Sequence, residues 1–489
     1  MKPEEMLNQD DATRREFLTQ APGRLIRRHA SPAVASMLFL ALYQIADGIM
    51  VGRSLGPEAM ASVNVLYPVV ALLSGLAVMI ATGGNARIAV LLGAGKQAEA
   101  GRVLGLIVGL GIALGVAGSL AAVLFMPVLL QILGTSGSLG HYAAGYLKGI
   151  LPFFVFMILG FVLEQSVRND GRPNLASGVM AACAVLNVGL DWLFLFVLQM
   201  GISGAAMASG ISQSLGAVVF IGYFVHKTVT GKPGLRFARP DRNPATVRAV
   251  AVNGSSEFFN SLSAGITTFL FNRLILAYVG PLGVAALTVV QYPMMLGVMV
   301  IMGIGSGTQP IFSYNHGAGL QRRVRDTLLR AAVTSSIAGV LVFFVMGPPA
   351  QSLAALFLPG HTEAQTLTRE VSQLVRWSML FMPLAMTASV YFTALEQAAK
   401  SLVVALARGL VLPVLGLALF PAWWGAAGIW ITPVFAEAVT VLIAAACYLG
   451  RRSAHAASGN AGGAGLRSRE QGACPQAPRI DPRLMLGLD

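Results

Sequence analysis

The stretch SPAVASMLFLALYQIADGIMV, from Ser31 to Val51, contains a single charged residue, Asp47, in an otherwise uncharged, largely apolar run. Its length matches the roughly 20 helical residues that cross the ~30 Å hydrocarbon core of a bilayer. An acidic side chain at that depth costs about 2.5–3.5 kcal/mol on insertion scales, so by default it marks a functional site. The alternative is an acid that a neighbouring helix satisfies for packing alone. The stretch therefore predicts a membrane helix with a polar group near its centre.

The composition of the whole chain is that of a polytopic membrane protein. Mean hydropathy is +0.69, and 11% of the residues are charged, against roughly 25% in soluble domains. The net charge of +13 comes largely from loops between apolar runs, where membrane topology explains it without nucleic acid as a partner. Three scattered cysteines indicate neither a disulfide framework nor a metal site. No cofactor is expected beyond a coupling ion.

Apolar runs and their breaks predict an all-α membrane protein with twelve transmembrane helices. The runs lie at 31–52, 59–90, 102–127, 141–166, 174–199, 203–226, 248–278, 283–314, 328–358, 370–396, 400–421 and 425–449. Lys and Arg gather in the loops after the even-numbered runs. The positive-inside rule places those loops, and both termini, in the cytoplasm.

The longest basic loop falls in the middle of the chain and predicts a linker between two six-helix lobes. We expect a cytoplasmic N-terminal segment at 1–29, an N-lobe of helices 1–6 at 30–226, the cytoplasmic linker at 227–247, a C-lobe of helices 7–12 at 248–450, and a cytoplasmic tail at 451–489. The tail is rich in Gly, Ala, Ser and Arg, a composition typical of disorder.

The two halves repeat short motifs in the same order. Gly56-Pro57 recurs as Gly280-Pro281, Tyr67-Pro68 as Tyr292-Pro293, Gly93-Ala94-Gly95 as Gly317-Ala318-Gly319, Leu163-Glu164-Gln165 as Leu395-Glu396-Gln397, and Gly204 as Gly428. Each half has an even number of helices, so the two halves run in the same direction through the membrane. Parallel repeats of this kind build transporters whose binding sites lie near the midplane.

Six of the 21 acidic residues fall inside apolar runs, namely Asp47, Glu164, Asp191, Glu257, Glu396 and Glu437. Glu164 and Glu396 lie near cytoplasmic ends, where a carboxylate reaches water, so a structural role is favoured for both. Glu257 either helps to bind a cation or pairs with a basic loop residue. Glu437 has no partner visible in the sequence.

Asp47 and Asp191 are expected near the midplane of the membrane. Counted from the outer turns at Gly56 and Gly201 at 1.5 Å per residue, they are ~13 Å and ~15 Å below the turns. Ser209 returns to nearly the same depth, while Asn187 and Tyr43 lie one helical turn from Asp191 and Asp47. These groups predict a site that exchanges a proton or binds a hard monovalent cation through oxygen atoms. A purely structural hydrogen-bond network is the alternative.

The second half lacks this set of groups. The motif alignment places Asn272 opposite Asp47, and Val411 and Leu415 opposite Asn187 and Asp191. The predicted coupling site is therefore confined to the first half. Asn272, Gln291 and Glu257 are candidates for a substrate pathway in the second half.

Six ordered motifs resemble the multidrug and toxic compound extrusion (MATE) family. They are DGIMVGRSLG from Asp47 to Gly56, RNDGRP from Arg168 to Pro173, NVGLD from Asn187 to Asp191, GISGAA from Gly201 to Ala206, QPIFSYNHGA from Gln309 to Ala318, and GAAGIW from Gly425 to Trp430. The overall style is closest to the small bacterial multidrug exporters. The resemblance implies two six-helix lobes in a V, alternating access, and export driven by inward H⁺ or Na⁺.

The resemblance also implies roles for individual residues. The first-lobe cation site of related prokaryotic members falls on Asp47, Asn187, Asp191 and Ser209, where Ser209 stands in place of the more usual Thr, and Tyr43 fits the aromatic position. Some members carry coupling acids in the second lobe. Here Glu257 lies earlier in its helix than that pattern requires, and the more cytoplasmic Glu396 replaces the acid of the tenth helix.

Our hypothesis is a monomeric secondary antiporter of the bacterial inner membrane, surrounded by lipid, that exports small organic, often cationic compounds in exchange for H⁺ or Na⁺. The alternative within the same superfamily is a flippase for a lipid-linked saccharide, which would favour a basic cavity. An enzyme would need a metal cluster or an activated nucleophile, yet the six histidines are scattered. A nucleotide-binding loop and a filter-like segment are both absent from the sequence, which disfavours an ATP-driven pump and a channel.

Overall fold

The computed structural model describes residues 12–465, apart from 57–58, 60–61, 64–65, 133–136, 348–354 and 356–361. The regular elements of this part of the chain are all helices. The chain divides into one unit of residues 1–444 and a second of residues 445–489. The second unit contains the C-terminal part of helix α19, and residues 466–489 of the predicted tail lie outside the described residues.

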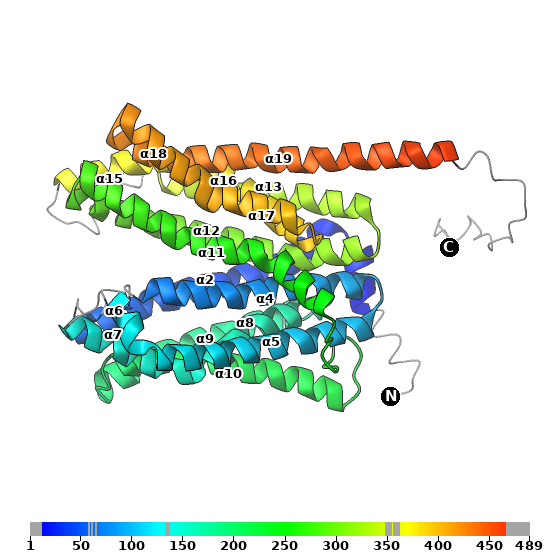
Figure 1. Cartoon of the computed structure of the whole chain (residues 1–489), viewed down its shortest axis with the longest axis horizontal. Coiled ribbons are helices and arrows are strands. Elements are labelled where there is room, and N and C mark those ends of the chain that lie inside the picture. Colours follow the sequence, from blue (N-terminus) through cyan, green and yellow to red (C-terminus); the bar gives the residue numbers. More distant parts are fainter. Residues whose placement is uncertain are drawn as a thin grey trace, which may run out of the picture. The chain divides into compact units, whose positions relative to one another are not determined.

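The first half of the chain forms a bundle of helices, blue to green in Figure 1. Its elements are α2 (Pro22–Leu55), α4 (Tyr67–Gly93), α5 (Gln97–Leu124), α6 (Met126–Ile132), α7 (Gly137–Ile150), η1 (Leu151–Phe153), α8 (Phe154–Asn169), α9 (Pro173–Trp192), the π-helical turn η2 (Leu193–Val197) and α10 (Ile202–Val229). We call this bundle the N-lobe. Helix α2 begins nine residues before the apolar run, at Pro22, a residue that suits the first turn of a helix. Hydropathy could not predict this start, because it marks the part of a helix inside the membrane and not the part that extends beyond it.

The second half forms the C-lobe, green to orange in Figure 1. Its elements are α11 (Pro244–Tyr278), α12 (Pro281–Gly317), α13 (Gln321–Val345), α15 (Thr362–Val375), α16 (Ser378–Ala394), α17 (Ala398–Leu406), the π-helical turn η3 (Ala407–Val411), α18 (Leu412–Trp424) and α19 (Ala426–Gly465). The sequence predicted that the last helix of the C-lobe ends by position 450. Helix α19 continues beyond that position, through a segment rich in the helix former alanine.

Ten helices in the described residues are long and apolar enough to cross a membrane, and the bent pair α15 and α16 makes an eleventh span. The remaining predicted span is α11. Its 35 residues exceed the length needed to cross, but its polar face lowers its hydropathy. Polar side chains of α11, among them Glu257, Asn260 and Asn272, line a cavity inside the protein. The twelve-helix, two-lobe prediction therefore stands.

The internal repeat is visible in the backbone. Gly56 and Gly280 have φ of 85° and 84°, and Gly201 and Gly425 have φ of 67° and 55°; each pair is 224 residues apart. Conformations with positive φ favour glycine, which explains why the motifs keep it. The match of Leu163-Glu164-Gln165 with Leu395-Glu396-Gln397 is wrong, however. Glu164 lies inside α8, and the loop residue with positive φ that corresponds to Glu396 (φ 56°) is Gly171 (φ 78°).

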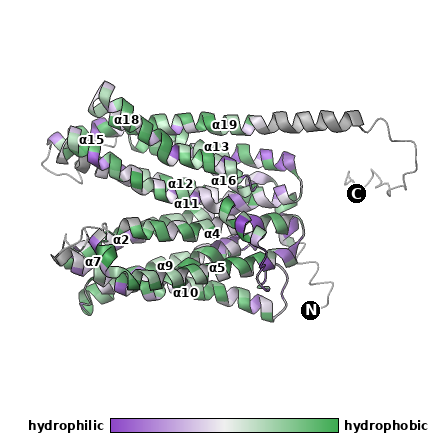
Figure 2. Ribbon diagram, viewed as in Figure 1, coloured by the Kyte–Doolittle hydropathy of each residue, from purple (hydrophilic) through white to green (hydrophobic). Residues whose placement is uncertain are grey.

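The two lobes approach each other closely at one end of the bundle, which carries the loops 94–96, 170–172, 318–320 and 395–397. We call it the basic end; hydrophilic residues gather there, whereas hydrophobic residues cover the middle of the helices (Figure 2). The main interlobe contacts are made by α4 with α11 and α12, and by α2 with α12. Glycine permits them, because a Cβ on Gly254 would lie 1.9 Å from the carbonyl oxygen of Met79, and one on Gly317 would lie 2.0 Å from that of Val90.

The segment before α2 joins both lobes at the basic end. Residues 12–19 are helical, and the Arg14 Nε donates to the Gly93 carbonyl of the N-lobe at 3.1 Å. From the C-lobe, Arg323 Nη2 donates to the Gln20 carbonyl at 2.5 Å. Phe17 is fully buried and stacks on Tyr314, with 4.3 Å between the ring centroids. The segment predicted only as a cytoplasmic terminus is therefore part of the interlobe contact.

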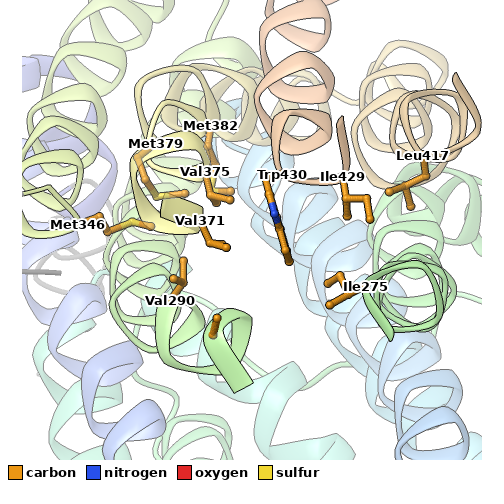
Figure 3. Packing of buried hydrophobic residues seen from close by; sticks show 11 residues of the cluster. Ile275, Val290, Met346, Val371, Val375, Met379, Met382, Leu417, Ile429 and Trp430 are labelled. Atoms are coloured by element: carbon orange, nitrogen blue, oxygen red, sulfur yellow. The ribbon is translucent and has the colours of Figure 1, made fainter. Parts of the chain in front are cut away.

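The far end of the C-lobe has its own apolar core. Figure 3 shows Val371, Val375 and Met379 from α15 and α16 facing Trp430 of α19, with Ile275 of α11 on the other side. This core holds α11, α12, α16 and α19 together, so the polar face of α11 is kept in a fixed position relative to α19. Both helices contribute to the site described next.

Candidate functional site

The five residues of the predicted coupling site come together inside the N-lobe. Tyr43 and Asp47 lie on α2, Asn187 and Asp191 on α9, and Ser209 on α10. Asn187 Nδ2 donates to Ser209 Oγ at 3.2 Å. The carboxylate of Asp47 lies within electrostatic range of Asp191 and of Tyr43. The depth argument from sequence expected these residues at one level of the membrane, and the structure places them side by side.

Several oxygen atoms of this cluster are buried without a hydrogen-bond partner. They are both carboxylate oxygens of Asp191, Oδ1 of Asp47 and the amide oxygen of Asn187, each unpartnered within the described part of the chain. The Asp191 side chain is fully buried, and Asn187 is 2% exposed. Buried polar atoms are normally paired, because leaving one unpaired costs about 1–3 kcal/mol. Four free acceptor oxygens around two acids form an arrangement that a proton or a hard cation would complete.

A small cavity of about 30 Å³ borders this cluster and is lined by Tyr43, Asn187, Ser209 and Gln213. A water molecule needs about 10–15 Å³ by this measure, so the cavity has room for a water or a small ion. Gln213 of α10 escaped the sequence analysis; its Nε2 donates to Tyr43 Oη at 3.5 Å. The signal that could have found it is its spacing of four residues from Ser209, which places both on one face of the helix.

Between the lobes lies a larger cavity of about 650 Å³. Its walls are formed by α2, α4, α8 and α9 of the N-lobe and by α11, α12, α15, α16, α17, α18 and α19 of the C-lobe, together with the turn η3. All three residues predicted for a substrate pathway, Glu257, Asn272 and Gln291, line this cavity. Methionine, phenylalanine and tryptophan side chains supply much of the remaining wall, as is typical of small-molecule sites.

The cavity also contains two ion pairs, one from each lobe. In the N-lobe, Arg168 Nη2 contacts Glu164 Oε1 at 2.5 Å and donates to Ser36 Oγ at 3.1 Å. In the C-lobe, Arg408 Nε contacts Glu437 Oε1 at 2.7 Å. The expectation that Glu437 lacks a partner was therefore wrong. Sequence reasoning missed Arg408 because it counted acids inside apolar runs but not bases, and an arginine in the run 400–421 is the same kind of signal.

The remaining intramembrane acid, Glu396, lies outside the cavity. It follows α16 at the basic end and accepts two hydrogen bonds from Arg87 of α4. A structural role, favoured from sequence for both Glu164 and Glu396, fits Glu396, because its pair joins the two lobes. Glu164 is paired as well, but its pair faces the cavity.

Comparison with known families agrees with this architecture. The MatE family model matches the chain twice, at residues 32–193 and at residues 258–418. One match falls in each lobe, and the linker lies between them, as the internal repeat requires. Together the two matches cover well over half of the chain.

Individual relatives and solved structures give the same result. The chain is 28% identical over 428 residues to the multidrug export protein MepA of Staphylococcus aureus (strain bovine RF122), covering 84% of this chain and 90% of that protein. It is 26% identical over 319 residues to MepA of Staphylococcus saprophyticus, covering 64% and 69%. A solved structure described as the outward-facing conformation of a multidrug resistance MATE family transporter superimposes with a TM-score of 0.84 at 24% identity, covering 90% of this chain and 98% of that one.

Proposed function

We propose that this chain, which belongs to the MatE family, exports small organic, chiefly cationic compounds in exchange for H⁺ or Na⁺. The observation that carries the coupling part of the proposal is the pair of unpartnered oxygens on the fully buried Asp191, beside Asp47. In the proposed setting it works as a monomer in a bacterial inner membrane with both termini in the cytoplasm, because the basic loops lie on that side.

The N-lobe cluster supplies the chemistry of coupling. Two carboxylates in a low-dielectric interior repel each other, and an ionised carboxylate without a partner is costly there. Binding one proton or one Na⁺ removes part of that cost. The free oxygens of Asp47, Asn187 and Asp191 are the hard ligands that such ions prefer, and the same oxygens serve a proton through hydrogen bonds. The ion therefore stabilises whichever arrangement of α2, α9 and α10 holds these oxygens together.

The cavity between the lobes is the proposed substrate site. Its volume of about 650 Å³ suits a drug-sized molecule, since such pockets commonly measure about 300–1,000 Å³. Flexible methionines in the wall, such as Met294 and Met382, adapt to ligands of different shape. Substrate and ion then occupy different sites, and α2 and α9, which reach both, connect them.

Exchange requires the lobes to open alternately on the two sides. In this structure the lobes are joined at the basic end through Arg87 with Glu396 and through residues 12–20. With the basic end in the cytoplasm, this arrangement is the state closed toward the inside. Ion binding then needs to favour one lobe arrangement by its differential affinity, and a tenfold preference corresponds to about 1.4 kcal/mol.

The flippase alternative receives less support. A site for a phosphate-linked saccharide calls for an excess of basic groups, whereas the cavity is lined by three acids, Glu164, Glu257 and Glu437, and two bases, Arg168 and Arg408. An excess of one acid suits an organic cation better.

Reconstituted vesicles test the proposal. Export of a fluorescent organic cation is measured under an imposed pH gradient, an imposed Na⁺ gradient and neither. We expect one of the gradients to accelerate wild-type export, and Asp47→Asn and Asp191→Asn each to lower the driven rate at least tenfold. Glu99→Gln is the matched control, because Glu99 is half-exposed at the start of α5, where it pairs with Lys96. Export that is indifferent to both gradients, or full activity of the Asn variants, would refute the coupling mechanism.

A further inference from the structure

The ion pair of the C-lobe lies at the place that corresponds to the edge of the N-lobe ion site. With the repeat offset of Gly204 and Gly428, Glu437 corresponds to Gln213 and Arg408 to Ala184. Gln213 contacts Tyr43 in the N-lobe cluster, and Ala184 lines the same small cavity. The two lobes thus present different chemistry at equivalent depth. At this level the N-lobe has neutral side chains beside its two acids, whereas the C-lobe has an arginine paired with a glutamate.

Arg408 is held in place by a local irregularity of its helix. It lies in the π-helical turn η3, which interrupts the helix between α17 and α18. Such turns carry an energetic cost and occur often at functional sites. The backbone carbonyl of Gly409 in this turn accepts a hydrogen bond from Thr267 Oγ1 of α11 at 2.7 Å. This hydrogen bond therefore connects the turn that contains Arg408 to α11.

Glu257 faces the same turn from α11. A Cβ on Gly409 would lie 3.7 Å from Asn260 Oδ1, and Asn260 is three residues, about one helical turn, from Glu257. The charge of Arg408 acts on Glu257 as well as on Glu437. All three side chains line the large cavity. Arg408 pairs with Glu437, and Glu257 lies within electrostatic range of the same guanidinium. With both carboxylates ionised, the three side chains carry one net negative charge.

One carboxylate oxygen of Glu437 is not used by its ion pair with Arg408. Its Oε1 contacts Arg408, while its Oε2 is buried without a hydrogen-bond partner in the described residues. The side chain of Glu437 is 7% exposed and that of Arg408 is 17% exposed. Burying such charges is costly for stability alone, and replacing them with apolar groups is often neutral or stabilising. Charged groups retained inside a membrane are better explained by a ligand.

We propose that Glu257, Arg408 and Glu437 form the substrate's charge-binding site, which holds one lipophilic monovalent organic cation, with Arg408 as a built-in competing cation. The proposal rests on the export function proposed above and names the part of the cavity that recognises the substrate's charge. The cation sits against the uncompensated carboxylate, and apolar wall residues such as Trp430 and Phe271 cover its hydrophobic surface. Arg408 limits the site to a single positive charge, so dications are bound poorly.

Equilibrium binding to the purified protein in lipid nanodiscs tests this charge count. The probes are tetraphenylphosphonium, a lipophilic monocation, and benzyl viologen, a lipophilic dication whose two charges lie close together, without any ion gradient. Glu257→Gln and Glu437→Gln each bring the group to neutrality, and we expect each to weaken monocation binding about tenfold. Arg408→Gln leaves two uncompensated acids, and we expect it to tighten benzyl viologen binding at least tenfold and monocation binding only a few-fold.

A double variant tests the same charge count if the single variant Arg408→Gln does not fold. Arg408→Gln alone leaves Glu437 buried and unpaired, which can prevent folding. Arg408→Gln with Glu437→Gln restores the single excess charge through Glu257. We expect it to bind the monocation within a few-fold of wild type and to show no gain for the dication. Glu99→Gln is the surface control and should bind both probes as wild type does.

The outcomes separate this inference from the proposed transport mechanism. Asp191→Asn should abolish driven export and yet keep tetraphenylphosphonium binding, because Asp191 lies outside the C-lobe group. Unchanged monocation binding in both Glu257→Gln and Glu437→Gln would overturn the charge-binding site, as would equal weakening of both probes by Arg408→Gln. A wild-type protein that binds neither probe would also overturn it, while leaving ion-coupled export of other compounds intact.

Discussion

Arg87 of the N-lobe donates to both carboxylate oxygens of Glu396 in the C-lobe, at 3.0 and 3.3 Å. The glutamate reaches this partner from a strained position, because its φ of 56° lies in the left-handed region where glycine is usual. At the corresponding position of the N-lobe the chain has Gly171. A charged residue has therefore taken the place of a glycine where the two lobes meet.

This relationship predicts different effects for two substitutions of one residue. Glu396→Ala loses the ion pair and keeps the backbone cost, whereas Glu396→Gly loses the pair and relieves a cost of roughly 1–2 kcal/mol. The pair is partly exposed, so its own contribution is about 0.2–1 kcal/mol. We expect the alanine variant to melt at the lower temperature and the glycine variant at or above the wild-type temperature. Thermal melting in detergent measures this; an equal loss in both variants would contradict the strain argument.

The fully buried ring of Phe17 predicts that residues 12–20 stabilise the state closed at the basic end. Phe17→Ala removes the stacking on Tyr314 and should lower the population of that state, since truncation of a buried Phe costs about 3–5 kcal/mol. Hydrogen exchange should accelerate in the loops 94–96 and 318–320. Leu18→Ala is the control, because Leu18 is only half-buried. Unchanged exchange in the Phe17 variant would show that the segment does not join the lobes.

Close glycine packing predicts a steric test of the same closed state. Gly254→Ala places a methyl group against the Met79 carbonyl on the opposite lobe, and backbone cannot give way as a side chain can. We expect export to fall at least tenfold with the protein still folded, since only the interlobe contact is blocked. Gly265→Ala on the same helix meets nothing within 4 Å and should transport normally. Interlobe distances from spin labels should lengthen at the basic end only in the Gly254 variant.

Asn187 predicts a change in ion affinity rather than in maximal rate. The Asn187 Nδ2 donates a hydrogen bond to Ser209 Oγ, and the unpartnered Oδ1 belongs to the proposed ion site. Asn187→Ala removes one neutral ligand, so the ion concentration for half-maximal export should rise several-fold while the rate at saturating ion is retained. Ser203→Ala, at the exposed start of α10, serves as the control. A lower maximal rate with an unchanged ion requirement would assign Asn187 to the substrate path instead.

The linker predicts a pH effect outside the membrane. Asp241 accepts hydrogen bonds from Thr246 Oγ1 at 2.7 Å and from the Asn243 backbone N–H at 3.0 Å, which lower its pKa. A lowered pKa in the folded state stabilises the start of α11 above the unfolded value of about 3.9, and this stabilisation is lost as the pH falls through the folded pKa. Amide protection at residues 245–248 should therefore fall below about pH 4 in wild type, but not in Asp241→Asn.

Much of this protein follows from its sequence. Apolar runs of bilayer length require helices, because backbone polar groups have no other partner in lipid. The spacing of Gly56 and Gly280 revealed the internal repeat of the two lobes, because turns with positive φ accept few residues other than glycine. Depth counted along a helix placed Asp47, Asn187, Asp191 and Ser209 at one level of the membrane, since the rise per residue is constant.

Tertiary structure decided what a one-dimensional reading cannot. Helix α11 is too polar for a simple hydropathy measure, and only the structure shows that its polar side chains line a cavity inside the protein. Arg408 and Glu437 are 29 residues apart, and Arg87 and Glu396 are 309 apart. Each pair forms because helix packing aligns particular faces of different helices. A charge's depth is local information, but its partner depends on how neighbouring helices are rotated, and that is set by packing across the whole bundle.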